Sequence, residues 1–227
     1  PLRLLDVGLQ QLLHLRLGKR PGHSPGHGPC SLTTADHLHE LIPVDGEGVR
    51  VDRLARHAHV RMLIVTPSHQ FPTGVVLPVA RRLWLLDWAR RSDAYIIEDD
   101  YDGEFRYEGR PLESLQGRDD HERVLYVGTF SKVMFPALRL GYVVVPESLV
   151  DAFLWMKAAS DTGSPSMDQD VLAEFIADGH LERHIRRTRV RNAERRRALV
   201  AAIDASLGKR VRAGGAAAGL HLWLEVP

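Results

Sequence analysis

Short apolar runs alternate with amphipathic stretches from residue 41 onward. The apolar runs are rich in β-branched and aromatic residues, as buried strands are, and they lie at 61–66 (RMLIVT), 94–101 (AYIIEDDY), 123–129 (RVLYVGT), 139–146 (RLGYVVVP) and 219–226 (GLHLWLEV). The segments between them have apolar residues at helical spacing, at 78–93, 148–161 and 167–207, the last with a break near Gly179. Strands interleaved with helices predict an α/β fold with a mostly parallel sheet and flanking helices.

Residues 1–40 have a different texture. The stretch GKRPGHSPGHGPCSLTTADHLHE (18–40) is dense in Gly, Pro and His and has no helical or strand period. His23 and His27 lie four residues apart, but a Gly/Pro segment does not place them on one face, and no carboxylate or thiol partner lies nearby. We therefore predict an irregular or aberrant, disordered segment rather than a metal site.

Composition narrows the classes of function. The chain has 227 residues, 44% of them hydrophobic, with 30 Lys and Arg against 29 Asp and Glu. A net charge of +1 gives no reason to expect nucleic-acid or membrane binding. No apolar run approaches the ~18 residues of a membrane span, and no signal peptide is recognisable. A single cysteine, Cys30, excludes an internal disulfide and fits a reducing cytosol, so a cytoplasmic location is expected.

The predicted strands deliver polar residues to one edge of the sheet. Three strand ends lead into SHQFPTG (68–74), EDDYDGEF (98–105) and GTFSK (128–132). In α/β folds ligands bind beyond the carboxyl ends of the strands. The acids could hold magnesium for phosphoryl transfer, but no phosphate-binding loop of the G-x-x-x-x-G-K-[ST] type is present.

A solvated acidic turn is the simpler interpretation of these acids, and we expect it for Asp102, Glu104 and Glu108. Asp99 fits it less well, because this residue follows the apolar run YII directly and should be partly buried. A buried carboxylate requires a positive partner or strong hydrogen-bond donors.

Lys132 is a candidate nucleophile. It lies between a predicted strand and the apolar VMFPAL, so its stem is expected in the interior. A lysine amine in an apolar environment can form a Schiff base with an aldehyde such as pyridoxal 5′-phosphate. That cofactor also requires a carboxylate at its ring nitrogen, a donor at its phenolate oxygen, and hydroxyls with an arginine at its phosphate. The right residue types are present as Asp99, Tyr101, Thr129, Ser131 and Arg139.

Three segments in this order, TPSHQFPTG, IIEDDYDGEFRY and YVGTFSKVMFPALRLGYVVVP, closely resemble the aminotransferase-like domain of MocR-type regulators of the GntR family. That domain is similar to the fold type I, class I/II aminotransferases, whose type is aspartate aminotransferase. The resemblance covers about residues 41–227 and is densest over 61–146. It implies a pyridoxal phosphate-binding large domain, partial here, over 41–150. Connecting helices and the start of an incomplete small C-terminal domain would follow over 151–227.

The resemblance also implies a role for each site residue. Lys132 matches the lysine that carries the cofactor as a Schiff base, and Asp99 matches the carboxylate at the pyridine nitrogen. Tyr101 matches the donor to the phenolate oxygen. The phosphate ligands correspond to Thr129, Ser131 and Arg139. Phe71 stands where ordinary aminotransferases carry a cofactor-facing asparagine, which favours the regulator branch and leaves Tyr101 as the main phenolate partner. His69 and Gln70 are further candidates for lining the cofactor.

Other departures point to a fragment. The winged-helix DNA-binding domain and linker of the family are not present, and GLQQ (8–11) resembles a remnant of a phosphate-holding segment. The aromatic segment expected next is not recognisable, and the carboxylate-binding arginine of the family would fall beyond Pro227. The chain starts on Pro1 rather than Met. The long predicted helix also carries many arginines, which go around the helix and alternate with Glu182 and Glu194: Arg183, Arg186, Arg187, Arg189, Arg191, Arg195, Arg196 and Arg197. This pattern indicates a solvated connecting helix rather than a DNA-binding stripe.

Three functions follow as hypotheses. The first is the effector domain of a regulator, in which an amino compound displaces Lys132 from the cofactor by transimination and DNA is bound only through the absent winged helix. The second is part of a working aminotransferase that transfers an amino group from an amino acid to a 2-oxo acid, with Lys132 as general base. The third is a remnant that does not retain the cofactor. Family members usually form homodimers, so a second copy is an expected partner.

Overall fold

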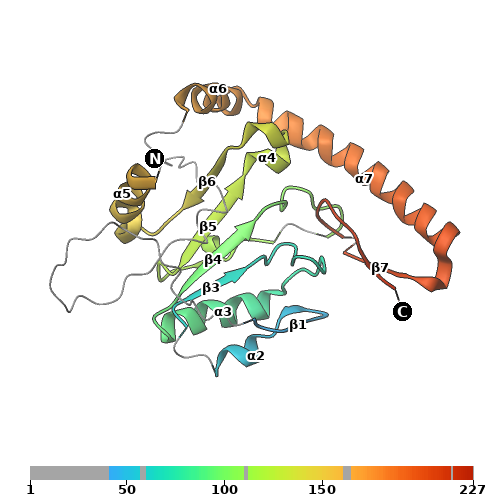
Figure 1. Ribbon diagram of the computed structural model, residues 1–227, viewed down its shortest axis with the longest axis horizontal. Coiled ribbons are helices and arrows are strands. Elements are labelled where there is room, and N and C mark those ends of the chain that lie inside the picture. Colours follow the sequence, from blue (N-terminus) through green and yellow to red (C-terminus); the bar gives the residue numbers. More distant parts are fainter. Residues whose placement is uncertain (1–40, 57–59, 110–111, 161–164, 216, 227) are drawn as a thin grey trace, which may run out of the picture.

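The computed structural model describes residues 41–227, apart from 57–59, 110–111, 161–164, 216 and 227 (Figure 1). The prediction for residues 1–40, including the histidine pair, lies outside the described residues. Across the described part, no helix combines the length and the apolar character that a membrane crossing requires.

A four-stranded sheet forms the centre of the molecule. Its strands are β3 (Met62–Val65), β4 (Tyr95–Asp100), β5 (Val124–Thr129) and β6 (Gly141–Val144), in that spatial order. The first three strands are parallel, and β6 is antiparallel to β5. The predicted strands at 61–66, 94–101, 123–129 and 139–146 and the mostly parallel sheet are therefore confirmed.

The reversed direction of β6 determines what lies at the edge where β4 and β5 end. Thr129, the last residue of β5, pairs with Gly141, the first residue of β6. Residues that precede β6 therefore lie at the same edge as residues that follow β4 and β5. This places Arg139 beside the ends of the parallel strands, although it comes before its own strand in the sequence.

One face of the sheet is covered by α3 (Val79–Arg91), with the short α2 (Val51–Leu54) and the hairpin of β1 (Val44–Asp45) and β2 (Gly48–Val49) beside it (Figure 1). The helix begins after Pro78, which has no N–H to leave unpaired, and it ends where Asp93 turns to a φ of 50°. Its apolar side packs on the sheet in a core that includes Leu85, Leu86, Trp88, Ala89, Ile96, Leu63 and Val65.

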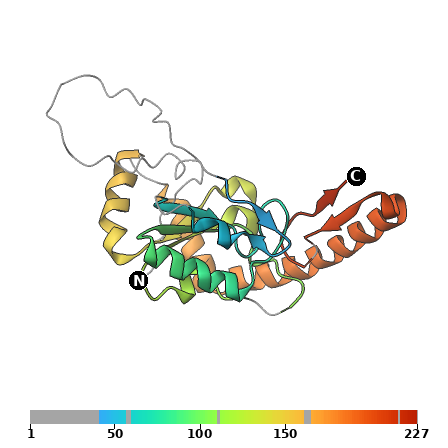
Figure 2. The same ribbon diagram turned by 90° about the horizontal axis from the view of Figure 1, so that it is seen from below.

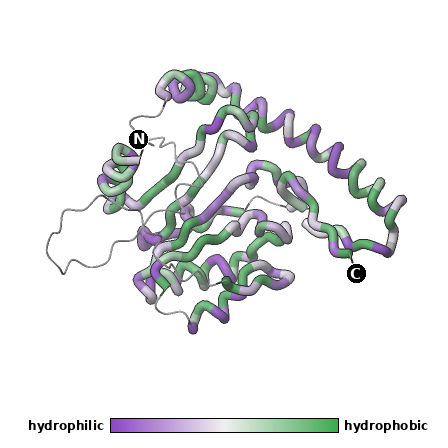
Figure 3. The backbone as a smooth tube through the Cα atoms, in the orientation of Figure 1, coloured by the Kyte–Doolittle hydropathy of each residue, from purple (hydrophilic) through white to green (hydrophobic). Residues whose placement is uncertain are grey.

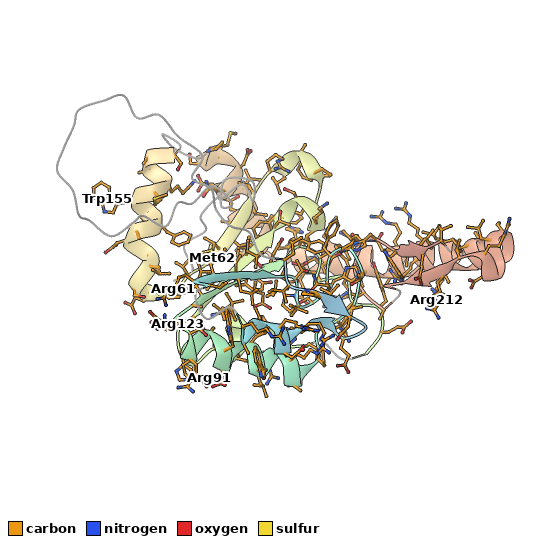
Figure 4. All side chains as sticks on the ribbon, turned by 60° about the horizontal axis from the view of Figure 1, so that its bottom comes forward. Arg61, Met62, Arg91, Arg123, Trp155 and Arg212 are labelled. Atoms are coloured by element: carbon orange, nitrogen blue, oxygen red, sulfur yellow. The ribbon has the colours of Figure 1, made fainter. Side chains whose placement is uncertain are left out.

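The opposite face of the sheet carries a second, smaller core. Ile97, Leu125, Val127 and Val143 form it, with Phe153 packed against them. Phe153 belongs to α5 (Val150–Ser160), which follows a single 3₁₀ turn, η3 (Glu147–Leu149). Trp155 on the same helix is 78% exposed and points away from the sheet (Figure 4).

Two further helices lead to the end of the chain. These are α6 (Ser166–Ala177) and α7 (His180–Leu207), and the predicted break between them is confirmed at Gly179, where φ is 69°. A 3₁₀ turn, η4 (Gly208–Arg210), leads to the antiparallel pair β7 (Arg212–Gly214) and β8 (Trp223–Glu225). The predicted strand at 219–226 is thus shorter than expected. Figures 1 and 2 show α7 as a long rod that leads away from the sheet.

The remaining elements are short and lie in loops between strands. They are η1 (Gln116–Arg118), α4 (Phe130–Val133) and η2 (Pro136–Leu138). Phe130 and Leu140 form a third apolar cluster with Leu172 of α6, which fixes α4 against the helical part of the chain. This anchoring matters because α4 carries Lys132.

Candidate functional site

A cleft of about 600 Å³ opens at the edge of the sheet where β4 and β5 end. Every predicted site residue lines it: Asp99, Tyr101, Thr129, Ser131, Lys132 and Arg139. The other lining residues include Thr66, Phe71, Leu220 and His221. The structure therefore brings together residues that are spread over four segments of the sequence, while their individual roles stay predictions.

Asp99 lies at the end of β4, beside Val127 of β5. Side chains alternate along a strand, so Asp99 shares the face of Ile97, opposite to the face that packs on α3. The expectation that Asp99 is partly buried is confirmed. Burial, followed by the negative charges of Asp100 and Asp102, raises the pKa of Asp99 to about 6.

The Asp99 carboxylate also tests whether the site fits a cationic ring. Its Oδ1 atom is buried, and no hydrogen-bond partner for it occurs among the described residues. A buried acceptor without a donor is costly, and a protonated ring nitrogen would supply both the donor and the compensating charge. The donor set around the cleft therefore fits pyridoxal phosphate.

Lys132 is exposed in the structure, which contradicts the expectation of a buried stem. The neighbouring Ser131 and Val133 take the buried positions of the short helix α4, so the helical rotation turns Lys132 out toward the cleft. Its amine is therefore accessible to a ligand. The apolar residues around it in the sequence pack underneath rather than around it, as Phe130 and Val133 show.

Thr129 and Ser131 are ordered by local hydrogen bonds. Thr129 is the N-cap of α4, and its Oγ1 accepts the Ser131 N–H at 3.2 Å. The same hydroxyl donates to the Leu140 carbonyl at 3.4 Å, which ties the end of β5 to the start of β6. Both hydroxyls line the cleft in this arrangement.

Arg139 reaches the cleft through an unusual backbone conformation. It follows η2 and has a φ of 51°, in the left-handed region that non-glycine residues rarely adopt. Arg139 is exposed and lines the cleft. Gly128 nearby has no room for a side chain, since a Cβ atom there would overlap the ring of Tyr142.

The prediction of a solvated acidic turn beyond β4 is wrong for Asp102 and Glu104. Asp102 is 1% exposed, and Glu104 is half-buried, while Glu108 is exposed as expected. Burial raises the pKa of Glu104 to about 7, assisted by Asp100 and Asp102. The reason is tertiary: residues 217–220 close over this loop, and the Tyr107 and Glu108 N–H groups both donate to the Ala217 carbonyl.

Sequence reasoning missed the contribution of residues 220–221. Leu220 and His221 line the cleft although they lie 79 or more residues beyond the other lining residues. The His221 Nε2–H donates to the Pro72 carbonyl at 3.2 Å. Burial lowers the pKa of His221, and nearby His69 lowers it further. No sequence signal marks this histidine, because its place depends on how the end of the chain packs.

His69 takes a different place from the one suggested by its motif. It does not line the cleft but is buried behind Tyr101, with 1% of its surface exposed. Its Nδ1 atom lies 3.1 Å from Asp102 Oδ2. Gln70 also stays outside the cleft lining, and its side chain donates to the Phe71 carbonyl at 3.2 Å.

The arginines of α7 agree with a solvated helix in most positions. All of them are exposed except Arg196, which is half-buried and donates to the Ala218 and Gly215 carbonyls. Arg189, although exposed, donates from Nε to the Glu104 carbonyl at 2.8 Å. Arg189 therefore holds the loop after β4 against α7, and Arg196 holds the end of the chain. The prediction of a solvated helix did not include these two contacts.

Comparisons with known proteins show the family of this chain. Residues 44–227 match the family described as aminotransferase class I and II. The HTH-type transcriptional regulator YdeL of Bacillus subtilis is 41% identical over 185 residues, which is 82% of this chain and 40% of that protein. The probable rhizopine catabolism regulatory protein MocR of Rhizobium meliloti is 44% identical over 162 residues, covering 70% of this chain and 32% of that protein.

A solved structure is similar over the same region. The kynurenine aminotransferase of Pyrococcus horikoshii, determined in complex with PMP, superposes with a TM-score of 0.76 and 30% identity. The match covers 82% of this chain and 48% of that one. The chain thus spans less than half the length of the regulators and of the enzyme that it matches.

Proposed function

Since this chain belongs to the aminotransferase class I and II family, we propose that it is the pyridoxal phosphate-binding effector domain of a MocR-type transcriptional regulator. One observation carries the proposal. The lysine, the carboxylate, the tyrosine, the hydroxyls and the arginine that such a cofactor requires all line a single cleft. In the proposed organisation, 41–150 is the cofactor-binding part, and 151–227 holds connecting helices and the start of a smaller domain.

Each residue around the cleft has a proposed task. The Asp99 carboxylate, buried and without a partner at Oδ1 among the described residues, holds a proton at the ring nitrogen. Tyr101 orients the phenolate side of the ring. Arg139, with the hydroxyls of Thr129 and Ser131, binds the phosphate. Lys132 presents its amine from α4 as the covalent attachment point.

When bound, pyridoxal 5′-phosphate supplies an aldehyde carbon that condenses with amines. The exposed position of Lys132 leaves its amine open to exchange with the amine of an incoming amino compound. The released lysine amine then remains in the cleft, where it can accept or hold a proton. In a regulator this exchange is the signal, and in an enzyme the same amine is the general base.

Two observations favour the regulator over an aminotransferase. The curated relatives described above are transcriptional regulators. Phe71, which lines the cleft, has no polar group to offer the cofactor at the position where aminotransferases carry asparagine. We therefore propose a cytoplasmic homodimer that responds to an amino acid or amine and contacts DNA through an HTH domain of the whole protein.

The first experiment is a titration of the purified chain with pyridoxal 5′-phosphate, followed by the visible absorption band of the imine. Lys132→Ala should lose the band, and borohydride followed by peptide mass spectrometry should place the cofactor on Lys132 in the wild type. Lys157→Ala is the matched control, because Lys157 belongs to α5 and does not line the cleft. This control should keep the band.

Further outcomes separate the alternatives. No band in a folded wild-type chain would refute cofactor binding by this chain. If added amines shift the visible imine band but no amino group is transferred to a 2-oxo acid, the result supports the effector domain. Steady transfer of an amino group from an amino acid to a 2-oxo acid would instead support the enzyme, and Lys132→Ala should abolish that transfer.

A further inference from the structure

A buried polar pair lies directly behind the cleft. His69 and Asp102 are each 1% exposed, and His69 Nδ1 lies 3.1 Å from Asp102 Oδ2. Neither side chain lines the cleft, so neither is placed to contact a ligand there. A buried carboxylate and imidazole are costly to desolvate, and apolar residues of similar volume would often stabilise the fold as well or better. The pair therefore points to a role beyond packing.

The pair contacts the hydroxyl of Tyr101, a residue that lines the cleft. The Tyr101 O–H donates to the His69 carbonyl at 3.0 Å, and its oxygen lies 3.3 Å from His69 Nδ1. A carboxylate can only accept hydrogen bonds, so the proton of His69 that faces Asp102 is on Nδ1. That N–H is also directed near the Tyr101 oxygen. The backbone and the ring of His69 thus fix the hydroxyl together.

The imidazole itself has little freedom to turn. A Cβ atom at Gly74 would lie 2.8 Å from His69 Nε2, and one at Gly219 would overlap His69 Cε1 and Nδ1. Two glycines from distant parts of the sequence therefore lie directly against the ring. The orientation of the N–H toward Asp102 and Tyr101 is set by this enclosure.

The same pair connects Tyr101 to the end of the chain. The Leu220 N–H donates to Asp102 Oδ2 at 3.0 Å, so one carboxylate oxygen accepts from both His69 and Leu220. The His221 ring lies 4.4 Å from the His69 ring and stacks on Tyr101 at 6.2 Å with an interplanar angle of 19°. The segment 219–221 thus meets the site through Asp102 and through ring contacts.

We propose that His69 and Asp102 are positioning residues that fix the Tyr101 side chain at the wall of the cleft through its hydroxyl and tie it to residues 219–221. The proposal rests on the proposed function, because Tyr101 acts on the cofactor there. His69 does not contact the cofactor in this proposal and acts only through Tyr101. Loss of His69 should therefore matter only while the Tyr101 hydroxyl is present.

A cation site is the rival interpretation of these side chains. His69, Asp102 and His221 offer ligand atoms within 4.8 Å of one another. The hydrogen bonds already described use the Nδ1–H of His69 and the Nε2–H of His221, and they leave His69 Nε2 and Asp102 Oδ1 without a partner among the described residues, so metal binding is tested directly. Tight stoichiometric zinc binding in calorimetry that His69→Gln abolishes would overturn the proposal.

The decisive experiment is a double-mutant cycle between His69→Gln and Tyr101→Phe in the 227-residue chain. The readout is the apparent dissociation constant of pyridoxal 5′-phosphate from the visible band. We expect His69→Gln to weaken binding about 10-fold in the wild type, as for one lost hydrogen bond, and less than about 2-fold in Tyr101→Phe. Equal losses in both backgrounds would show a purely structural role and overturn the proposal.

Control variants show whether a loss of cofactor binding comes from misfolding or from the loss of the Tyr101 contact. His121→Gln and Asp120→Asn change the same residue types at exposed positions and should leave binding unchanged. Asp102→Asn provides a second variant if His69→Gln fails to fold, and it should show the same dependence on the Tyr101 hydroxyl. Circular dichroism and thermal unfolding identify the variants that are folded.

The protonation state of the His69 ring can be measured without cofactor. Long-range ¹H–¹⁵N spectra of the imidazoles should show His69 protonated at Nδ1, and Tyr101→Phe should shift that signal. An Nε2-protonated His69 would overturn the proposal. If the wild type forms no visible band while this tautomer is present, the proposed function fails but the hydrogen-bonded unit stands.

Discussion

The sheet and the helices that follow it are held in place in different ways. In the sheet region, Leu85, Ala89, Ala94 and Ile96 are 0% exposed, and helix and strands share a continuous apolar core. Among the described residues of α5, α6 and α7, only Leu172 is buried, although α7 alone is 28 residues long. Figure 3 shows the same contrast, with apolar residues concentrated along the strands and mixed polar and apolar residues along α7.

This difference explains where the site is formed. Residues that must be held accurately lie at the ends of β4 and β5, which have packed cores on both faces of the sheet. The helical part reaches the cleft only through Leu220 and His221 among the described residues, and polar contacts hold that segment. The well-packed strands therefore carry the proposed chemistry, and the loosely packed helical region contributes only one segment to the cleft.

Arg82→Met should have the largest effect on stability. Arg82 is 0% exposed and donates to the carbonyls of Leu77, Pro67 and Glu113 at 3.0, 2.8 and 3.0 Å. Its charge also lies 3.8 Å from the buried Glu98 carboxylate. Removing it leaves that carboxylate without a positive partner and should lower the free energy of unfolding by about 3–5 kcal/mol.

Urea unfolding followed by circular dichroism measures this loss. Arg187→Met, on an exposed face of α7, is the matched control and should change stability by less than about 0.5 kcal/mol. Equal shifts for both variants would remove the contrast between the sheet and the helical region.

Asp99→Asn should have the second-largest effect, and it should stabilise the cofactor-free chain instead of destabilising it. The pKa of Asp99 is raised from 3.8 to about 6, so the folded state binds the proton more tightly than the unfolded state. Stability should therefore fall as pH rises from about 4 to about 6 and stay lower above that range. A shift of this size corresponds to at most about 3 kcal/mol, and we expect a gain of about 2 kcal/mol for Asp99→Asn at pH 7.5.

Thermal unfolding of both proteins at pH 4.5 and pH 7.5 tests this prediction. The difference between them should shrink at the lower pH, and Asp120→Asn should show no such dependence because Asp120 is exposed. With excess pyridoxal 5′-phosphate the wild type should be more stable than Asp99→Asn, because only the Asp99 carboxylate can compensate the charge of the protonated ring nitrogen. A gain that is the same at both pH values would contradict the burial of the Asp99 charge.

Arg196→Met should have the smallest of these effects, of about 1–2 kcal/mol. Its guanidinium donates to the Ala218 and Gly215 carbonyls and lies 5.2 Å from the centre of the Tyr107 ring. Hydrogen exchange should show faster opening of residues 217–221 with β3 to β6 unchanged. Arg197→Met, at the exposed neighbouring position, is the control. Uniformly faster exchange across the sheet would mean that the two regions unfold as one unit.

Most of the fold could be predicted because its signals are local. Apolar β-branched runs indicated each strand of the central sheet, Pro78 marked the start of α3, and Gly179 marked the break before α7. The direction of β6 could not be predicted from its own residues, because an apolar run has the same pattern in either direction. The burial of Lys132 was predicted wrongly, since apolar neighbours in sequence do not decide which side of a short helix faces the cleft.

The sequence by itself determined the set of reactive residue types and the strands that carry them, because side-chain chemistry and strand pattern are properties of nearby residues. Only the tertiary structure decided that Asp102 is buried, that His69 faces Tyr101 rather than the cleft, and that His221 reaches the site. Those outcomes depend on residues 217–221 packing against loops more than 100 positions earlier in the chain. Desolvation and hydrogen bonding across such a distance arise only when the chain has folded.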